Sequence, residues 1–183
     1  LEQGDPGLTQ DFDHALFEDG AFGDLPNDRR HALKLFGSYR FTDEWSVGGN
    51  LLVQSGRPVN CQGYIPQDDP SIGIDDDYFP LYGASSFYCR DEAGNRVLTQ
   101  RGSYGRTPWT RTLDATVAYS PNFADQKLTF RADVFNLFDA DTVTEYNEVG
   151  DLTPNTTSLS PEFLNNVNFQ TPRSVRFSVR YDF

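Results

Sequence analysis

The sequence contains no methionine, and only two cysteines and two histidines among its 183 residues. It also lacks any run of about 18 apolar residues, which excludes a transmembrane helix. Its first residues, from Leu1 to Asp5, form neither the basic nor the apolar region of a secretory signal peptide. Without an initiator methionine, the chain is expected to be a processed product or a piece of a longer protein.

Basic residues are scarce, because 15 Lys and Arg stand against 27 Asp and Glu and give a net charge of -12. Nucleic-acid binding requires basic stripes, so we predict no nucleic-acid partner. The mean hydropathy of -0.57 is typical of a soluble protein. Membrane strands that alternate polar and apolar residues give equally low values, so this index does not exclude a membrane protein. Aromatic residues, by contrast, are plentiful at 14% and favour β-structure.

The clearest pattern lies in residues 172–183, where apolar and polar residues alternate without interruption. A period of two places these sets on opposite faces of a β-strand. The apolar face carries Val175, Phe177, Val179, Tyr181 and Phe183, and the polar face carries Ser174, Arg176, Ser178, Arg180 and Asp182. A strand with one fully apolar face must bury it against a protein core or a lipid bilayer.

Four further segments alternate in the same way, within two predicted hairpins at 31–57 and 110–138. The expected strands are 31–41, 45–57, 110–120 and 127–138, with short turns at 42–44 and 121–126. The segments 1–30, 58–109 and 139–171 show no strand-like alternation and are expected to be long loops, which hold most of the acidic residues. Short connections and long loops therefore alternate along the chain.

Charge falls on one face of these strands only. The apolar faces hold no charged residue, whereas the opposite faces hold Lys34, Arg40, Asp114, Arg131, Asp133, Arg176, Arg180 and Asp182. We interpret Arg131, Asp133, Arg176 and Arg180 as lumen- or plug-facing residues that form cross-strand ion pairs. No nucleophile elbow, phosphate loop or paired catalytic motif is present, so we predict no catalytic residue and no enzyme.

Strand length favours a bilayer over a core. Strands of about 11 residues exceed the usual length in soluble sheets, but match the span of a tilted membrane strand. Aromatic residues gather near the short-turn side of the strands, as in an interfacial girdle: Tyr39, Phe41, Trp45, Tyr119, Tyr181 and Phe183. We therefore predict an all-β fold that is part of an antiparallel transmembrane β-barrel. Since five strands cannot close a barrel, the other strands are expected from preceding sequence.

Several motifs resemble the closing strands of TonB-dependent outer-membrane receptors, and most closely the Oar-like branch. They are Leu25–His31 (LPNDRRH), Phe36–Tyr39, Ser55–Pro58, Leu128–Asp139 (LTFRADVFNLFD) and Pro172–Phe177 with the terminal Phe183. The Asn-Leu-Phe-Asp and terminal aromatic elements are fairly specific together and weak singly. The resemblance extends from about residue 11 to residue 183.

The resemblance implies that this chain forms the last five strands of a barrel of about 22 strands, plugged by an N-terminal domain. It implies energy-coupled uptake of a scarce ligand through the TonB–ExbB–ExbD system, in the outer membrane of a Gram-negative bacterium with the long loops extracellular. The expected partners are the plug and remaining strands of the same receptor, outer-membrane lipid and the barrel-assembly machinery. Val179, Tyr181 and Phe183 would resemble the signal read by that machinery.

The 58–109 loop carries the candidate binding chemistry. A disulfide between Cys61 and Cys89 is the expected structural staple, since neither the spacing nor a nearby histidine suggests a metal site. Candidate ligand contacts are Tyr64, Asp75, Asp76, Asp77, Tyr78 and Tyr82. The three aspartates suggest Ca²⁺ as the one conceivable cofactor, although a solvated acidic loop is the preferred interpretation of them, and loop packing explains the tyrosines at least as well as a ligand does.

Three functions remain open on the sequence alone. The first is a TonB-dependent receptor that takes up a siderophore, a peptide or a glycan. The second is a barrel that only anchors, adheres or displays, as in an autotransporter. The third is a soluble, secreted all-β binding module that uses the Cys61–Cys89 loop.

Overall fold

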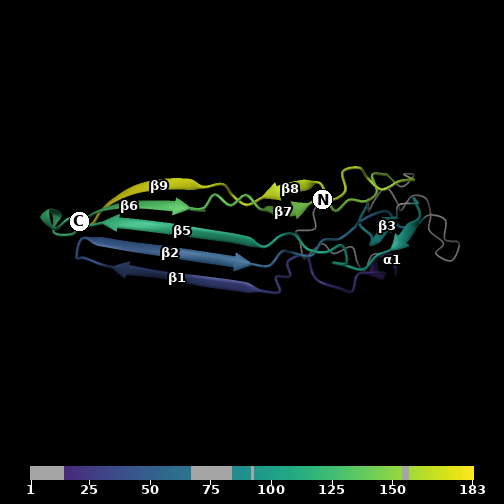
Figure 1. The fold of residues 1–183 in the computed structure, drawn as a ribbon, viewed down its shortest axis with the longest axis horizontal. Coiled ribbons are helices and arrows are strands. Elements are labelled where there is room, and N and C mark those ends of the chain that lie inside the picture. Colours follow the sequence, from purple (N-terminus) through teal and green to yellow (C-terminus); the bar gives the residue numbers. More distant parts are fainter. Residues whose placement is uncertain (1–14, 67–83, 92, 154–156) are drawn as a thin grey trace. The chain divides into compact units, whose positions relative to one another are not determined.

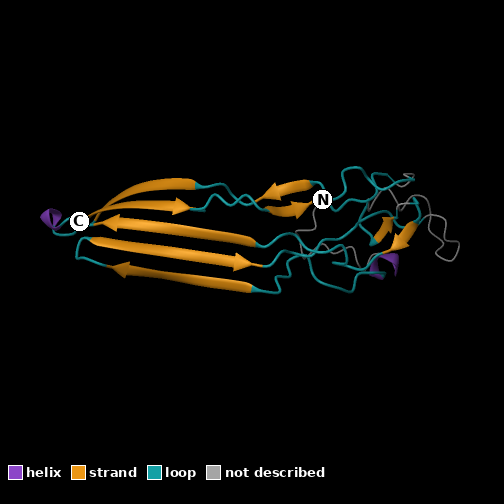
Figure 2. Ribbon diagram, viewed as in Figure 1, coloured by secondary structure: helices purple, strands orange, loops and turns teal. Residues whose placement is uncertain are grey.

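The computed structural model describes residues 15–66, 84–91, 93–153 and 157–183. This part of the chain is almost entirely strand and loop (Figure 2). It divides into two compact units. The loop unit comprises Leu1–Asp28, Arg57–Thr107 and Glu145–Val167, and the sheet unit comprises Arg29–Gly56, Pro108–Thr144 and Asn168–Phe183. No helix among the described residues is long and apolar enough to cross a membrane.

The sheet unit contains one antiparallel sheet of five strands in the order β1-β2-β5-β6-β9 (Figure 1). The strands are β1 (Ala32–Arg40), β2 (Trp45–Gln54), β5 (Thr110–Tyr119), β6 (Leu128–Phe135) and β9 (Ser174–Tyr181). All five strands predicted from the alternation are therefore present, within three residues of their expected ends. The all-β, antiparallel fold class is confirmed.

The strand β6 ends earlier than predicted, at Phe135 instead of Phe138. The cause is Asn136, whose backbone lies in the left-handed region with a φ of 49°. Its backbone N–H donates to Asp114 Oδ1 at 3.0 Å, and its side-chain amide donates to the carbonyl oxygens of Ala140 and Thr171 at 2.9 Å each. These hydrogen bonds replace the backbone hydrogen bonds between strands beyond Phe135. Asparagine suits this position because it tolerates the left-handed conformation and its side chain bonds readily to nearby backbone.

Both short connections lie at the same end of the sheet. The registers align Arg40 with Ser46, Trp45 with Tyr119, and Leu128 with Tyr181. Phe41–Glu44 joins β1 to β2, and the segment between β5 and β6 contains a single 3-10 turn, η2 (Asn122–Ala124). The chain leaves the opposite end of the sheet at each long segment, as the alternation of loop lengths predicts.

No large apolar side chain of the five strands is buried among the described residues. The exposed fraction is 80% for Phe177, 66% for Val179 and 55% for Leu35. Apart from prolines, the buried apolar residues of the described chain all belong to the loop unit: Phe17, Val59, Cys61, Ile65, Ala84, Phe87 and Cys89. Each exposed Phe, Leu or Val forgoes about 1.5–3 kcal/mol of burial free energy, so this face requires an apolar environment from outside the described chain.

The long segments contain short elements that the sequence pattern did not predict. The loop unit includes α1 (Ala15–Glu18) and the two-stranded ladder of β3 (Tyr88–Arg90) with β4 (Arg96–Leu98). A second short ladder pairs β7 (Val143–Tyr146) with β8 (Asn166–Phe169). Elements of three or four residues are too short to show a period, which is why alternation did not reveal them.

Candidate functional site

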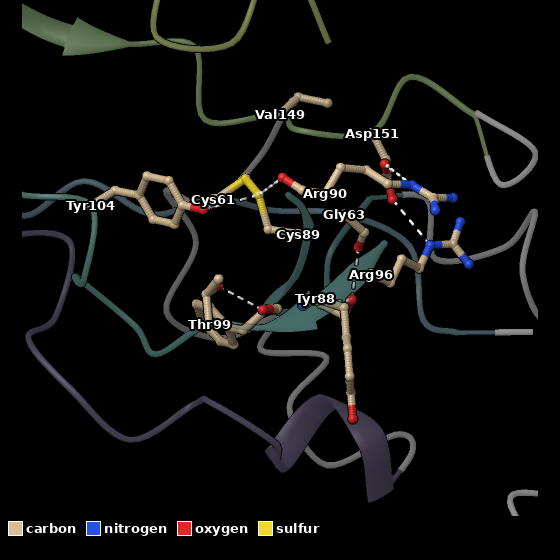
Figure 3. The surroundings of a disulfide bond; sticks show 12 residues. Cys61, Gly63, Tyr88, Cys89, Arg90, Arg96, Thr99, Tyr104, Val149 and Asp151 are labelled. Carbon is tan, nitrogen blue, oxygen red and sulfur yellow. Dashed lines mark hydrogen bonds and ion pairs between the residues drawn. A yellow bond between two sulfur atoms is a disulfide. The ribbon is translucent and has the colours of Figure 1, made fainter. Parts of the chain in front are cut away.

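A buried disulfide joins two segments of the loop unit. Cys61 and Cys89 are bonded, with their Cα atoms 5.7 Å apart, and both side chains are fully buried (Figure 3). The Tyr104 hydroxyl donates to Cys89 Sγ at 3.5 Å. Gly150 packs so closely against the disulfide that an added Cβ would lie 2.5 Å from Cys61 Sγ. The predicted disulfide is present, and a third segment, around Gly150, packs against it.

Asp151 is the ionic centre of the same region (Figure 3). Its side chain has no exposed surface, and it accepts hydrogen bonds from Arg90 Nε at 3.0 Å and Arg96 Nε at 3.3 Å. The backbone N–H of Tyr64 donates to its second oxygen at 3.3 Å. One carboxylate thus ties the β3–β4 ladder to residues near both cysteines.

A further arginine, Arg106, connects the 57–107 part of the loop unit to Asp24 and Asp28 in its first segment. Arg106 donates to Asp24 Oδ2 at 2.7 Å and to the carboxylate and carbonyl oxygens of Asp28. The hydrogen bond that Arg106 donates to Asp28, together with the one it donates to Asp24, raises the pKa of the Arg106 guanidinium further above its already high ordinary value. The Arg106 guanidinium therefore forms its ion pairs within the loop unit.

The loop unit also encloses a half-open cavity of about 350 Å³, which lies within the size range of ligand pockets. Its polar lining is Asn27, Arg57, Gln62, Glu145, Asn147 and Glu148. Tyr146 and the apolar side chains of Pro26, Val149 and Val167 complete the wall. Every lining residue belongs to the loop unit.

Charges in the cavity wall are arranged around Arg57. Its guanidinium lies 2.8 Å from Glu148 Oε1 and 3.9 Å from Glu145 Oε1. Asn60 donates its side-chain N–H to Glu148 Oε2 at 2.8 Å. Burial raises the pKa of the Glu148 carboxyl above its ordinary value, and the nearby Arg57 charge opposes this shift. The wall is thus largely paired internally, with a partly desolvated carboxylate.

Gln62 is the exception to this pairing. Only 3% of it is exposed, yet its side-chain Nε2 has no hydrogen-bond partner among the described residues. Its backbone is fixed, because Gln62 N donates to the Glu148 carbonyl at 2.8 Å and its carbonyl accepts from Gly150 N at 2.7 Å. One residue of the cavity lining therefore carries a buried side-chain amide donor that has no acceptor among the described residues.

Most of the ligand contacts predicted from the sequence lie outside the described residues. This applies to Asp75, Asp76, Asp77, Tyr78 and Tyr82, so the suggested Ca²⁺ site there stays a prediction. Tyr64 is described, half-buried and adjacent to the Asp151 cluster. No group of three or more potential metal ligands occurs within the described residues.

The cavity itself was missed by the sequence reading. Its charged residues come from the end of a predicted strand (Arg57) and from a segment read only as a polar loop (Glu145 and Glu148). Glu145 and Glu148 lie 83 and 86 residues after Gln62, and no spacing rule connects them. Only the folded loop unit brings them together.

The strand charges form a second cluster, in the sheet unit. Asp133, only 2% exposed, is paired with Arg131 at 2.7 Å and with Arg176 on the neighbouring strand at 2.9 Å. Thr116 donates its hydroxyl to the same carboxylate at 2.6 Å. Arg180 lies apart and pairs with Asp182 at 2.8 Å. The assignment of these residues to a lumen or plug-facing surface stays a prediction.

The suggested assembly residues lie at and just beyond the end of β9. Val179 and Tyr181 are exposed on that strand, and the Tyr181 ring meets the Phe183 ring edge-on, with centroids 5.4 Å apart. Their recognition by an assembly machinery stays a prediction.

Comparison with known proteins gives one related sequence. No family model matches the chain. The chain is 27% identical to the TonB-dependent transporter Oar of Myxococcus xanthus, over 98% of its own length and 18% of that protein. It therefore spans less than a fifth of the relative it matches. This similarity confirms the resemblance to TonB-dependent receptors of the Oar-like branch that the motifs indicated.

Two solved structures are also similar. The ferric-catecholate import receptor Fiu of Escherichia coli K12 matches 87% of this chain and 15% of its own, with 22% identity and a TM-score of 0.47. The outer membrane transporter YddB of Escherichia coli matches 76% of this chain and 14% of its own, with 14% identity and a TM-score of 0.41. At these scores the likenesses add nothing to the fold described above.

Proposed function

We propose that this chain is the C-terminal part of a TonB-dependent receptor, which takes up a scarce ligand across the outer membrane of a Gram-negative bacterium. The observation that carries the proposal is the uncovered apolar face of the five-stranded sheet. It occurs in a chain that resembles a TonB-dependent transporter along nearly its whole length. The related sequence named above is a TonB-dependent transporter, which supports a transport role and not an enzymatic one.

Lipid is the environment that this face fits. The strands have eight to ten residues, close to the about 9–11 residues that cross a bilayer at a tilt. Exposed Phe177 and Val179 would then contact acyl chains. Trp45 and Tyr119, whose ring centroids are 4.6 Å apart at the short-turn end, would lie at the interface.

The two edges of the sheet imply further strands. Within the described residues, β1 and β9 each pair with a neighbour on one side only. Unpaired backbone groups in hydrocarbon cost several kcal/mol each, so both edges require partners within a closed barrel. In the proposed receptor these come from the rest of a barrel of about 22 strands.

The distribution of charge agrees with loops outside and strands inside the membrane. The loop unit holds 19 acidic and five basic residues, whereas the sheet unit holds eight acidic and ten basic residues. The charged side chains within the strands gather in clusters such as that of Asp133, on the face opposite to Phe177. In this proposal that face borders the lumen and the plug, and the acidic loop unit is extracellular.

The proposal also assigns partners. The plug and the remaining strands of the same receptor would enclose the lumen, TonB–ExbB–ExbD would supply energy through the N-terminal part, and the assembly machinery would read Val179, Tyr181 and Phe183. All of these follow from the resemblance and from the exposed strand faces.

Growth on defined nutrients tests the function. A strain lacking the gene and a strain lacking TonB are compared with the parent on panels of single carbon, nitrogen and iron sources. The proposal expects at least one source on which both mutants fail, with the protein in the outer-membrane fraction. Loss of surface adhesion with unimpaired growth would instead identify a display barrel, and recovery in the soluble fraction would identify a secreted module.

A further inference from the structure

One charged residue interrupts the apolar face of the five-stranded sheet, at the end where the long segments begin. The register places Arg111 of β5 directly opposite Val53 of β2, which in turn lies opposite Leu33 of β1 (Figure 1). Residues paired across antiparallel strands share one face, so Arg111 lies in the same row as two apolar side chains. It is the one charge that the five described strands place on this face, which the sequence pattern read as uncharged.

The guanidinium of Arg111 is not used within the sheet unit. The residue is exposed, and its guanidinium forms no hydrogen bond or ion pair with another described residue. Its backbone is fixed by the pairing of β5 with β2, and its carbonyl accepts from Gln170 Nε2 at 3.0 Å. Two other charged residues near this end of the sheet, Arg173 and Asp139, pair with each other at 3.7 Å. Arg111 therefore presents a positive charge that no described carboxylate neutralises.

A stacked pair of aromatic rings lies just before the starts of β1 and β5. His31 precedes β1 and Trp109 precedes β5 by one residue each. Their ring centroids are 5.9 Å apart, with an angle of 7° between the ring planes, and 55% of Trp109 is exposed. Tryptophan is enriched at membrane interfaces, because its ring is apolar while its N–H can donate to a headgroup. The aromatic pair thus marks an interfacial level beside Arg111.

The two ends of the apolar face are separated by about the thickness of a membrane. Tyr119 ends β5, eight residues after Arg111, which corresponds to about 27 Å along the strand. At that end Tyr119 packs against Trp45. In a barrel whose strands tilt by about 40°, this length spans roughly 20 Å of height, and the apolar band of such barrels is about 25 Å tall. Because an arginine side chain can extend its charged group toward water, Arg111 falls at the outer boundary of this band.

We propose that Arg111 binds the phosphate of a phosphorylated lipid in the outer leaflet, with the exposed Trp109 ring beside the same headgroup. A guanidinium matches phosphate geometry through two parallel N–H···O hydrogen bonds. The row that contains Arg111 continues into Val53 and Leu33, which fit the acyl chains of a lipid and offer nothing to a dissolved anion. This inference rests on the proposed function, which supplies the membrane location of the sheet.

The test measures lipid binding to the full-length receptor in detergent by native mass spectrometry. The probe is phosphorylated lipid A, and the reference is the same lipid after enzymatic removal of its phosphates. We expect the probe to bind at least fivefold more tightly, which is roughly the effect of one basic residue at an anionic lipid surface.

Variants assign the preference to one side chain. Arg111→Gln should lower the affinity for the phosphorylated probe about fivefold and leave that for the reference unchanged. Arg111→Lys should retain part of the preference, because lysine keeps the charge but loses the paired donors. Arg40→Gln is the matched control, since it removes the same charge from the opposite face at the short-turn end, and it should leave binding unchanged.

The comparison of the two lipids uses wild-type protein, so it decides the question even if Arg111→Gln does not fold. The proposal is overturned if wild type binds both lipids equally, or if folded Arg111→Gln binds the probe as wild type does. Displacement of the lipid by inorganic phosphate at comparable concentration would also overturn it, because the site would then serve a soluble anion. Binding in detergent needs no energy coupling. Phosphate-dependent lipid binding without a TonB-dependent growth defect therefore refutes only the transport function, and a growth defect with equal binding of both lipids refutes only the lipid site.

Discussion

Replacing Asp151 by asparagine should destabilise the loop unit while leaving the stability of the five-stranded sheet unchanged. The substitution conserves shape but removes a charge that pairs with both Arg90 and Arg96. The arginine side chains are 13% and 9% exposed, and the Asp151 side chain is fully buried. Removing one partner of a buried ion pair costs about 3–5 kcal/mol, because the remaining charge is left desolvated. Since asparagine retains an acceptor oxygen, we expect the lower end, about 3 kcal/mol.

Hydrogen–deuterium exchange of the full-length protein in detergent measures this loss locally. At about 1.4 kcal/mol for each factor of ten, protection in residues 61–66, 84–91 and 145–153 should fall roughly 150-fold. Strand β9 should keep its protection. Glu162→Gln, which removes the same charge from an exposed residue of the loop unit, is the matched control and should change protection by less than threefold.

A triple variant tests whether charge pairing or packing stabilises the loop unit. When all three charges are removed together, in Arg90→Met, Arg96→Met and Asp151→Leu, the desolvation penalty disappears and most of the protection should return. A fall of less than tenfold in Asp151→Asn would show that the cluster is not a stabilising centre. A triple variant less protected than Asp151→Asn would show that packing, and not charge pairing, holds the unit.

Three further outcomes follow from the structure. Replacing Cys61 and Cys89 by serine should destabilise the loop unit by about 3.5 kcal/mol in the chain-entropy model for a separation of 28 residues; exchange at residues 145–153 reports it, and unchanged protection would contradict it. Phe177→Arg should destabilise the membrane-inserted protein by about 2–4 kcal/mol, whereas Ser178→Arg on the opposite face should not; urea unfolding in lipid vesicles compares them, and equal effects would remove the lipid-facing assignment. Because burial raises the pKa of Glu148, its contribution to stability is present at low pH and is lost as the pH rises through that pKa. The melting temperature of Glu148→Gln minus that of the wild type should therefore increase with pH across this range, and a decrease would refute the shift.

The strands were predictable because their information is local. An alternation such as Val175, Phe177 and Val179 against Arg176 and Ser178 fixes both the strand and its two faces, without reference to any other part of the chain. The short turns also made two of the pairings predictable, those of β1 with β2 and of β5 with β6. The strand ends were less predictable, because they depend on bonds such as that from Asn136 to Thr171, which joins residues from different segments.

The loop unit was much less predictable. The disulfide followed from having only two cysteines in one segment, and the structure contains it. The ladders β3–β4 and β7–β8 are too short to produce a period. Tyr64 was selected for its chemistry and lies beside the Asp151 cluster, whereas Gln62, two residues earlier, carried no signal at all.

The sequence by itself determined the class of fold, the faces of the strands, the disulfide and the resemblance to TonB-dependent receptors, since each depends on residues near one another in the chain or on a recognisable motif. Only the tertiary structure decided that Arg57, Gln62 and Glu148 share a cavity, that Asp151 joins two arginines, and that no described residue covers the apolar face of the sheet. These features are contacts, or missing contacts, between distant segments. They depend on how the chain returns upon itself, which periodicity along the sequence does not encode.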